Sequence, residues 1–224
     1  MRQNINFLVV DDHPVFRQGL VALVESDARY TVVDEVGSVS EAMAVLEKRV
    51  PDIALVDISL VGQSGLNLVK TIKASYPGII ILIISMHDEA VYAERAIKAG
   101  AKGYVMKHEA ASVMKEAIRT VLSGKIYLSA TMRDSLVESM FMPSEKERSP
   151  TRLHLPTVER LSDRELDVLE LIGQGYGAAE IAERLNLSAK TINTYRDNIK
   201  EKLNIPNAGE LRRFAIKWEH SLSE

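Results

Sequence analysis

The chain has 224 residues, of which 46% are apolar and 26% charged, and its net charge is -3 at pH 7. This composition is ordinary for a globular protein, and the length allows one large domain or two small ones. The absence of cysteine excludes disulfides, thiol catalysis and cysteine-ligated zinc. The longest apolar stretch, residues 79–84, is far shorter than the roughly 20 residues that span a bilayer. The N-terminus also lacks a signal-peptide pattern, so we expect a cytoplasmic protein with no membrane partner.

The first 123 residues alternate between short apolar runs and helical patterns. We expect strands at residues 5–10, 31–36, 53–57, 79–84 and 102–106, and helices at residues 14–26, 39–49, 65–75, 88–99 and 109–122. Pro14 suits a first helical turn, Ser38 or Ser40 can cap the second helix, and Gly100 follows the fourth helix as a C-cap would. Five β-α repeats predict an α/β fold with a five-stranded parallel, doubly wound sheet.

Four charged residues, Asp11, Asp12, Asp57 and Lys107, each follow a strand-like run. Ligands of open α/β sheets bind at the carboxyl ends of the strands, so we expect these side chains to converge there. Mg²⁺ is held by a few carboxylates together with phosphate oxygens. A carboxylate can then attack a phosphoryl donor if a metal and a cation neutralise the charge. The structural alternative is that each aspartate caps the next helix and the lysine is solvated.

A polar, proline-bounded run separates this region from the rest of the chain. Residues 130–140 have the pattern of a short helix, and residues 143–150 cannot bury a core. We therefore divide the chain into a domain at 1–123, a linker at 124–158 and a second domain at 159–224.

The second domain has the outline of a small all-α helix-turn-helix domain. Helices are expected at residues 163–173, 178–185, 189–203 and 207–219. Ser162 and Glu165 form a capping-box pattern at the start of the first of these helices, and Ser188 can cap the third. Two short helices joined by a tight, glycine-containing turn are typical of helix-turn-helix proteins.

The third of these helices, residues 189–203, carries the candidate DNA contacts. Ile192, Ile199 and Leu203 share one face and should pack inward, which leaves a polar face outward. Asn and Thr side chains can read base edges, Lys and Arg can neutralise phosphates, and an Asp can accept from a cytosine amine or pair with a basic neighbour. The predicted contacts are Lys190, Thr191, Asn193, Thr194, Arg196, Asp197, Lys200 and Lys202. The structural alternative is a solvated charged face.

Residues 1–122 resemble the receiver domain of two-component response regulators. The matching residues are Asp11-Asp12-His13-Pro14, Asp57, Gly65-Leu66, Ser85 and residues 99–104 leading to Lys107. The resemblance implies Asp57 as the phosphoacceptor, a Mg²⁺ site that we assign to Asp11, Asp12, Asp57 and Ser59, Lys107 as a phosphate ligand, and Ser85 with Tyr104 as the switch pair. It also implies a sensor histidine kinase as the phosphodonor.

This region departs from the receiver pattern in two places. His108 follows Lys107 where many receivers have proline, and Val61 stands where many carry proline after the acceptor. Ser59 and His87 occupy positions that tune phosphoryl lifetime in the family.

Residues 159–219 resemble the helix-turn-helix of the LuxR and NarL type, through residues 161–165, Glu180-Ile181-Ala182, Lys190-Thr191-Ile192 and Lys202-Leu203. The domain order is similar to that of the NarL/FixJ transcription regulators. The resemblance implies that phosphorylation of Asp57 switches binding to double-stranded DNA. It also implies a homodimer in the phosphorylated or DNA-bound state, with Ala208 and Leu211 at its seam.

Two alternatives remain open from the sequence. A Mg²⁺-dependent phosphatase of the haloacid-dehalogenase type also uses a strand-end aspartate, but it needs a second acid two residues later, where this chain has Ser59. A DNA-binding regulator that works without phosphorylation is the other alternative, which the complete acid set disfavours. We expect a switched regulator rather than a turnover enzyme.

Overall fold

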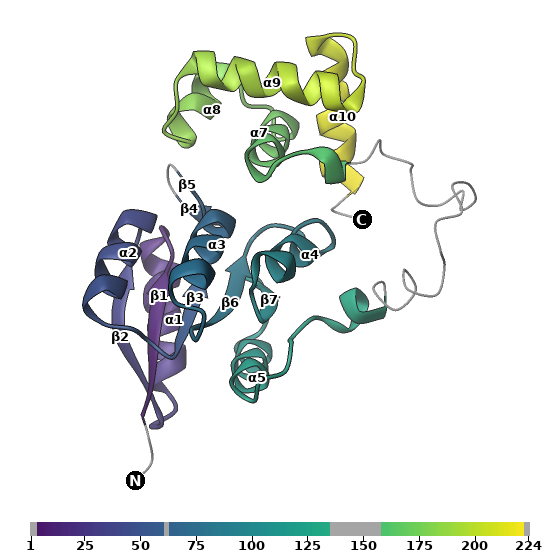
Figure 1. Cartoon of the computed structure of the whole chain (residues 1–224). Coiled ribbons are helices and arrows are strands. Elements are labelled where there is room, and N and C mark those ends of the chain that lie inside the picture. Colours follow the sequence, from purple (N-terminus) through teal and green to yellow (C-terminus); the bar gives the residue numbers. More distant parts are fainter. Residues whose placement is uncertain (1–3, 61–62, 135–157, 222–224) are drawn as a thin grey trace. The chain divides into compact units, whose positions relative to one another are not determined.

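The computed structural model of the chain describes residues 4–60, 63–134 and 158–221 (Figure 1). The chain divides into two compact units, Met1–Pro143 and Ser144–Glu224. No helix within the described ranges is long and apolar enough to cross a membrane. Most of the linker predicted at 124–158 lies outside the described residues, so its boundaries stay a prediction.

The N-terminal unit contains a five-stranded parallel sheet with the strand order β2-β1-β3-β6-β7 (Figure 1). The strands are β1 (Ile5–Val10), β2 (Tyr30–Val36), β3 (Ile53–Val56), β6 (Ile80–Ser85) and β7 (Gly103–Met106). The helices are α1 (Pro14–Glu25), α2 (Val39–Lys48), α3 (Gly65–Ser75), α4 (Glu89–Ala99) and α5 (Ala111–Leu122). The predicted α/β fold is confirmed.

Both faces of the central strands are buried, which explains their continuous apolar sequences. Phe7 and Val9 of β1 pack in one core cluster with Leu20 of α1 and Ile118 of α5. Leu8 and Val10 point to the opposite face of the sheet and are also buried. Because β1 lies between β2 and β3, the strand order reverses there, and sheets of this kind bind ligands at the carboxyl ends of the strands beside such a reversal.

The predicted helix signals act as expected in the described residues. Pro14 is at the first position of α1, Ser38 accepts from the amide of Glu41, and Gly100 ends α4 with a φ of 110°. The structure adds a small antiparallel hairpin that the sequence did not predict, made of β4 (Ser59–Leu60) and β5 (Gln63–Ser64). β4 begins two residues after Asp57.

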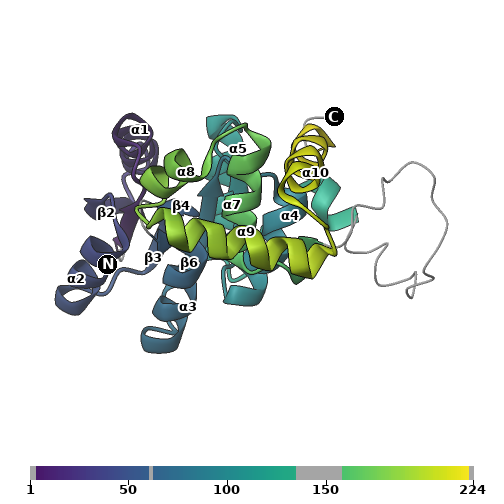
Figure 2. The same ribbon diagram turned by 90° about the horizontal axis from the view of Figure 1, so that it is seen from above.

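The described part of the C-terminal unit is helical. A 3-10 turn (Val158–Arg160) precedes α7 (Asp163–Gly173), α8 (Ala178–Arg184), α9 (Ala189–Leu203) and α10 (Ala208–Ser221). Figure 2 shows α8 at the N-terminal end of α9 and α10 at its C-terminal end. The capping box of Ser162 and Glu165 is present at the start of α7, and Ser188 caps α9. The predicted helix-turn-helix architecture is confirmed.

Close packing of two helices holds this small unit together. A Cβ added to Gly173 of α7 would lie 2.7 Å from the carbonyl oxygen of Ala215 in α10, so glycine permits the approach. Leu166, Ile199 and Trp218 are almost completely buried between the helices. The inward face predicted for α9 is therefore the face that packs.

Candidate functional site

Three charged side chains meet at the carboxyl edge of the sheet. Asp11 follows β1, Asp57 follows β3 and Lys107 follows β7, and they are only 1%, 2% and 8% exposed. The Nζ of Lys107 lies 2.7 Å from Oδ2 of Asp11 and 2.8 Å from Oδ2 of Asp57. Because buried charges are costly unless they are paired, this arrangement depends on the lysine balancing both acids.

The backbone fixes the place of these residues. The N–H of Asp57 donates to the carbonyl of Val10 at 2.9 Å, and the N–H of Lys107 donates to the carbonyl of Ser85 at 2.7 Å. A Cβ added to Gly65 would lie 1.9 Å from the carbonyl oxygen of Asp57, so α3 can start here only with glycine. Gly65 therefore allows the start of α3 to pack against the main chain of Asp57.

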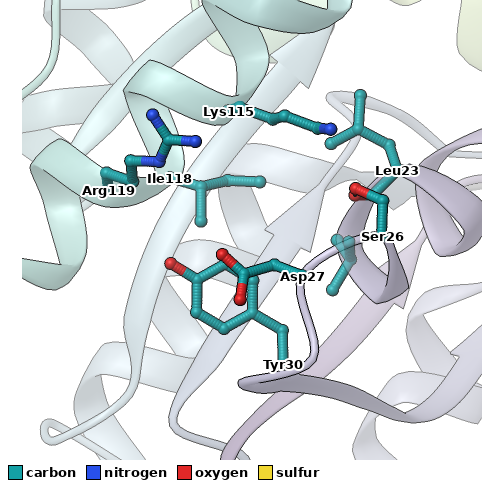
Figure 3. Close-up of a pocket in the computed structure, with 8 residues that line it drawn as sticks. Leu23, Ser26, Asp27, Tyr30, Lys115, Ile118 and Arg119 are labelled. Atoms are coloured by element: carbon teal, nitrogen blue, oxygen red, sulfur yellow. The ribbon is translucent and has the colours of Figure 1, made fainter.

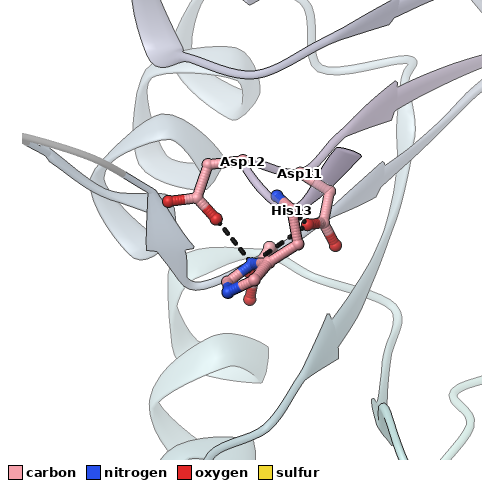
Figure 4. A group of neighbouring side chains, drawn as sticks. Asp11, Asp12 and His13 are labelled. Atoms are coloured by element: carbon pink, nitrogen blue, oxygen red, sulfur yellow. Dashed lines mark hydrogen bonds and ion pairs between the residues drawn. The ribbon is translucent and has the colours of Figure 1, made fainter. Parts of the chain in front are cut away.

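Asp12 completes the acid cluster and contacts His13 (Figure 4). The Nδ1 of His13 lies 2.7 Å from Oδ1 of Asp12 and 3.4 Å from Oδ1 of Asp11. The ligand atoms of Asp11, Asp12, Asp57 and His13 all lie within 4.8 Å of one another. The contacts of His13 with Asp11 and Asp12 were not predicted from the sequence. The position of His13 directly after these two acids could have indicated them.

Burial and crowding of the acids favour a divalent cation. Burial raises the pKa of Asp57, and the nearby Asp11 carboxylate adds to this, while Lys107 opposes it. Burial likewise raises the pKa of Asp12, whereas His13 lowers it. A bound cation would favour the ionised form of each acid. Carboxylate oxygens are the ligands that Mg²⁺ prefers, so the donor set fits that ion.

The two predicted switch residues both contact His87. Ser85 is fully buried, and its Oγ accepts a hydrogen bond from the N–H of His87 at 3.1 Å. The hydroxyl of Tyr104, a residue that is 1% exposed, donates to the carbonyl oxygen of His87 at 2.7 Å. The ring of His87 lies 2.5 Å from the hydroxyl of Ser59 and stacks on Tyr92. His87 therefore links the loop after Asp57 to Ser85 and Tyr104.

Two further features surround Lys107. Its Nζ lies 4.6 Å from the centre of the Phe16 ring, where a cation–π contact adds to the two ion pairs. No peptide bond among the described residues is cis, so the bond between Lys107 and His108 is trans. No pattern in the sequence predicts the contact between Lys107 and Phe16.

A separate cavity of about 100 Å³ opens at the other edge of the same sheet (Figure 3). The cavity is lined by the C-terminal end of α1, the start of β2 and α5. It lies near the amino end of β2, whereas the acid cluster lies at the carboxyl ends of the strands. Its lining residues are Leu23, Val24, Ser26, Asp27, Tyr30, Lys115, Ile118 and Arg119. The phosphate chemistry predicted from the sequence does not involve this cavity.

The outer face of α9 carries the predicted DNA contacts. Lys190, Asn193, Thr194, Asp197 and Lys202 are exposed, and Thr191, Arg196 and Lys200 are half-buried. The hydroxyls of the two threonines have local partners, because that of Thr191 lies 2.8 Å from the Ser188 hydroxyl and that of Thr194 donates to the carbonyl of Lys190. The polar face is therefore available to a partner, while two of its hydroxyls are used within the helix.

Two of the basic residues on α9 form ion pairs within the unit. Lys200 lies 2.9 Å from Asp197, so this acid pairs with a basic neighbour, one of the two roles that the sequence allowed for it. Lys202 lies 2.5 Å from Glu165, which is 3% exposed. Burial alone would raise the pKa of Glu165, but Lys202 and the amide and hydroxyl of Ser162 lower it. Lys202 thus joins α9 to α7 in addition to its predicted contact with DNA.

The two residues predicted at a dimer seam differ in exposure. Ala208 is exposed at the start of α10, whereas Leu211 is fully buried in the core of the unit. The side chain of Leu211 therefore packs within its own unit, and Ala208 is the member of the pair that a second subunit can reach.

Known proteins match both units. Residues 7–119 match the family model of the response regulator receiver domain, and residues 159–215 match that of the bacterial regulatory proteins of the luxR family. The oxygen regulatory protein NreC of Staphylococcus carnosus is 34% identical over 214 residues, which cover 95% of this chain and 97% of that protein. NreC of Staphylococcus epidermidis is also 34% identical, over 215 residues, with the same coverage.

Solved structures of response regulators are also similar to this chain. The response regulator RcsB of Salmonella typhimurium is 25% identical over 95% of this chain and 98% of its own, with a TM-score of 0.57. A LuxR-family two-component response regulator from Aurantimonas is 31% identical over 61% of this chain and 98% of its own, also with a TM-score of 0.57.

The fold, the acid cluster and these matches define a two-component response regulator with a DNA-binding output domain. The chain belongs to the response regulators that join a receiver domain to a LuxR-type helix-turn-helix domain, and it is a transcriptional regulator.

Proposed function

We propose that Asp57 accepts a phosphoryl group and thereby switches DNA binding by the C-terminal unit. The observation that carries this proposal is the buried carboxylate of Asp57, which faces the Lys107 ammonium and lies beside two further acids. A carboxylate so placed has both a cation and a metal-binding set within reach of a transferred phosphoryl group. The donor is a sensor histidine kinase or a small acyl phosphate.

The transfer forms one bond and breaks one. A carboxylate oxygen of Asp57 forms a bond to phosphorus, while the bond from phosphorus to the donor's imidazole nitrogen or acyl oxygen breaks. The leaving group departs with that electron pair. Lys107 stabilises the charge on the phosphoryl oxygens, since its ammonium already lies next to Asp57.

Magnesium fits the same edge of the sheet. Asp11, Asp12 and Asp57 would hold the ion, which supplies charge neutralisation when bound. Ser59, whose hydroxyl lies 2.5 Å from the His87 ring, is the fourth residue that we propose at this ion. The resulting aspartyl phosphate is a signal and not a step of sustained turnover.

Phosphorylation adds negative charge and acceptor oxygens beside Ser85 and Lys107. The Ser85 hydroxyl can donate to these oxygens, and Tyr104 follows because it bonds the loop that begins after Ser85. This shift allows the C-terminal unit to act as a dimer on DNA, with α9 in the major groove. RcsB, one of the related proteins, has been solved bound to a promoter in the presence of the phosphomimetic beryllofluoride. Because the target is chromosomal DNA, we place this function in the cytoplasm.

The test is labelling by acetyl phosphate, followed by phosphate-affinity electrophoresis. We expect Asp57→Asn to abolish the shifted band and to keep the circular dichroism spectrum of the unaltered chain. Asp34→Asn is the matched control, because Asp34 is an exposed acid on the edge strand β2 and is not a member of the acid cluster. Undiminished labelling of Asp57→Asn would remove the proposed acceptor.

The family matches favour this function over a haloacid-dehalogenase-type phosphatase. Such an enzyme also needs an acid two residues after its nucleophile, and this chain has Ser59 at that position. Release of phosphate from a generic substrate over many turnovers would restore the enzyme hypothesis.

A further inference from the structure

The outer edge of β7 is covered by the segment that follows α5. β7 is the last strand in the sheet order, so one of its edges has no neighbouring strand in the sheet. After α5, Gly124 adopts a φ of 84° and the chain turns back along this edge. The N–H of Tyr127 donates to the carbonyl of Lys102 at 2.9 Å, and the N–H of Tyr104 donates to the carbonyl of Tyr127 at 3.2 Å. We call residues 125–134 the strap.

The strap is packed closely against the strand. A Cβ added to Gly103 would lie 2.9 Å from the carbonyl oxygen of Tyr127 and 3.0 Å from its Cβ, so this position of β7 needs a glycine. The Tyr127 side chain packs at the margin of the core cluster of the N-terminal unit. Its burial, reinforced by Glu116 and Glu109, raises the pKa of the Tyr127 hydroxyl. The strap is therefore an added layer of the fold.

A second contact joins the strap to α4. The hydroxyl of Ser129 donates to the carboxylate of Glu89, the first residue of α4. The same Ser129 oxygen accepts from the N–H of Met132 at 3.0 Å, at the start of a helical segment described over residues 130–134. Met132 is 7% exposed. Ser129 thus caps the helical part of the strap and fastens it to α4.

Both attachment points adjoin the switch residues. Tyr104 binds the strap through its main-chain N–H and binds the His87 carbonyl through its hydroxyl. Glu89 lies two residues after His87, whose own N–H donates to Ser85. A movement of the loop between β6 and α4 toward Asp57 must therefore displace Glu89 relative to the strap.

We propose that the strap transmits the phosphorylation state of the receiver to the C-terminal unit by leaving α4 when Asp57 is phosphorylated. The Ser85 hydroxyl turns to the phosphoryl oxygens, the loop from Ser85 to Glu89 follows, and the bond from Ser129 to Glu89 breaks. The helical part of the strap, which leads into the chain toward the DNA-binding unit, then loses its anchor. This inference rests on the proposed role of Asp57.

Amide hydrogen exchange of the full chain tests the proposal, with Mg²⁺ present throughout and beryllofluoride added or omitted. We expect beryllofluoride to speed exchange in peptides from residues 125–134 by about two- to tenfold, the effect of losing one hydrogen bond. Peptides covering residues 53–60 and 84–88 should slow. Slower exchange at these site peptides with an unchanged strap would overturn the inference alone. No change in either region would overturn the proposed function and the inference with it.

Matched variants separate the strap contact from general loosening. Ser129→Ala should speed strap exchange without beryllofluoride and reduce the further increase that beryllofluoride causes. Ser123→Ala is the control, because the Ser123 hydroxyl donates to the Thr120 carbonyl at the end of α5 and does not contact α4. Glu89→Gln keeps an acceptor oxygen and should behave as the unaltered chain, whereas Glu89→Ala should reproduce Ser129→Ala. A Ser129→Ala chain with unaltered strap exchange would refute the proposal.

Discussion

The charged residues of the two units are arranged in opposite ways. In the N-terminal unit Asp11, Asp57 and Lys107 are buried and contact one another, so their charges balance inside the protein. On α9 of the C-terminal unit, Lys190 and Lys202 are both exposed. A phosphoryl group on Asp57 would change the ion pairs that Lys107 makes with Asp11 and Asp57. The exposed lysines of α9, in contrast, are accessible to solvent and to DNA. Under the proposed function, the buried charges would serve the switch and the exposed charges would serve DNA recognition.

The largest effect is expected from removing the buried cation. Lys107→Met removes the ammonium that pairs with the buried Asp11 and Asp57, and the free energy of unfolding of the N-terminal unit should fall by about 3–5 kcal/mol. Asp57→Asn added to Lys107→Met should recover part of this loss, because one of the two uncompensated charges is gone. Urea unfolding followed by circular dichroism measures both, while fluorescence of Trp218 reports the C-terminal unit separately.

An exposed lysine provides the control for Lys107→Met, and the stability of Lys107→Met should also depend on pH. Lys98→Met removes a lysine whose ion pair with Glu94 is exposed, so stability should change by only about 0.5 kcal/mol. The pKa of Asp57 is already raised in the folded chain, and loss of Lys107 raises it further. The folded state then binds more protons than the unfolded state, so the stability of Lys107→Met should increase as pH falls through that pKa. A deficit that is the same at all pH values would contradict a balanced buried cluster.

The N-terminal fold could be predicted because the apolar runs and the residues at helix ends indicate the same strands and helices. Buried parallel strands have continuous apolar runs, and Pro14, Ser38 and Gly100 mark helix ends through local geometry. The positions of Asp11 and Asp57 followed from topology alone, since adjacent parallel strands end at one edge.

Other parts of the site depend on contacts that no periodicity encodes. The bond between Ser59 and His87 joins residues 28 apart, and the pair of Lys202 with Glu165 joins residues 37 apart. The bridge at Tyr127 is a single pair of residues, too short to produce an alternating pattern. Sequence patterns predict which face of an element is buried, but they do not predict which polar partner a side chain finds on another element.

A smaller effect is expected from the one basic residue of α9 that pairs with a buried acid. Lys202→Met should lower the free energy of unfolding of the C-terminal unit by about 1–2 kcal/mol at neutral pH, a modest effect because the Lys202 side chain is 39% exposed. The pKa of Glu165 is lowered from 4.5, so this contribution is present above pH 4.5 and is lost as pH falls through the lowered value. Trp218 fluorescence during urea unfolding measures it, with Lys190→Met as the control. Equal stability of the two variants would show that the ion pair to Glu165 contributes nothing.

The smallest predicted differences distinguish the exposed lysines of α9 by their effect on DNA binding. Lys190→Ala should weaken binding to selected and unrelated DNA alike and reduce the slope of log affinity against log salt by about 0.9, the effect of one phosphate contact. Lys200→Ala should also weaken binding, but less, because Lys200 already pairs with Asp197. Asp197→Asn should strengthen non-specific binding, since it frees Lys200 and removes a charge that repels phosphates. Fluorescence anisotropy over a series of salt concentrations resolves all three variants. If Lys190→Ala weakened binding only to the selected sequence and kept the salt slope, Lys190 would read a base and not a phosphate.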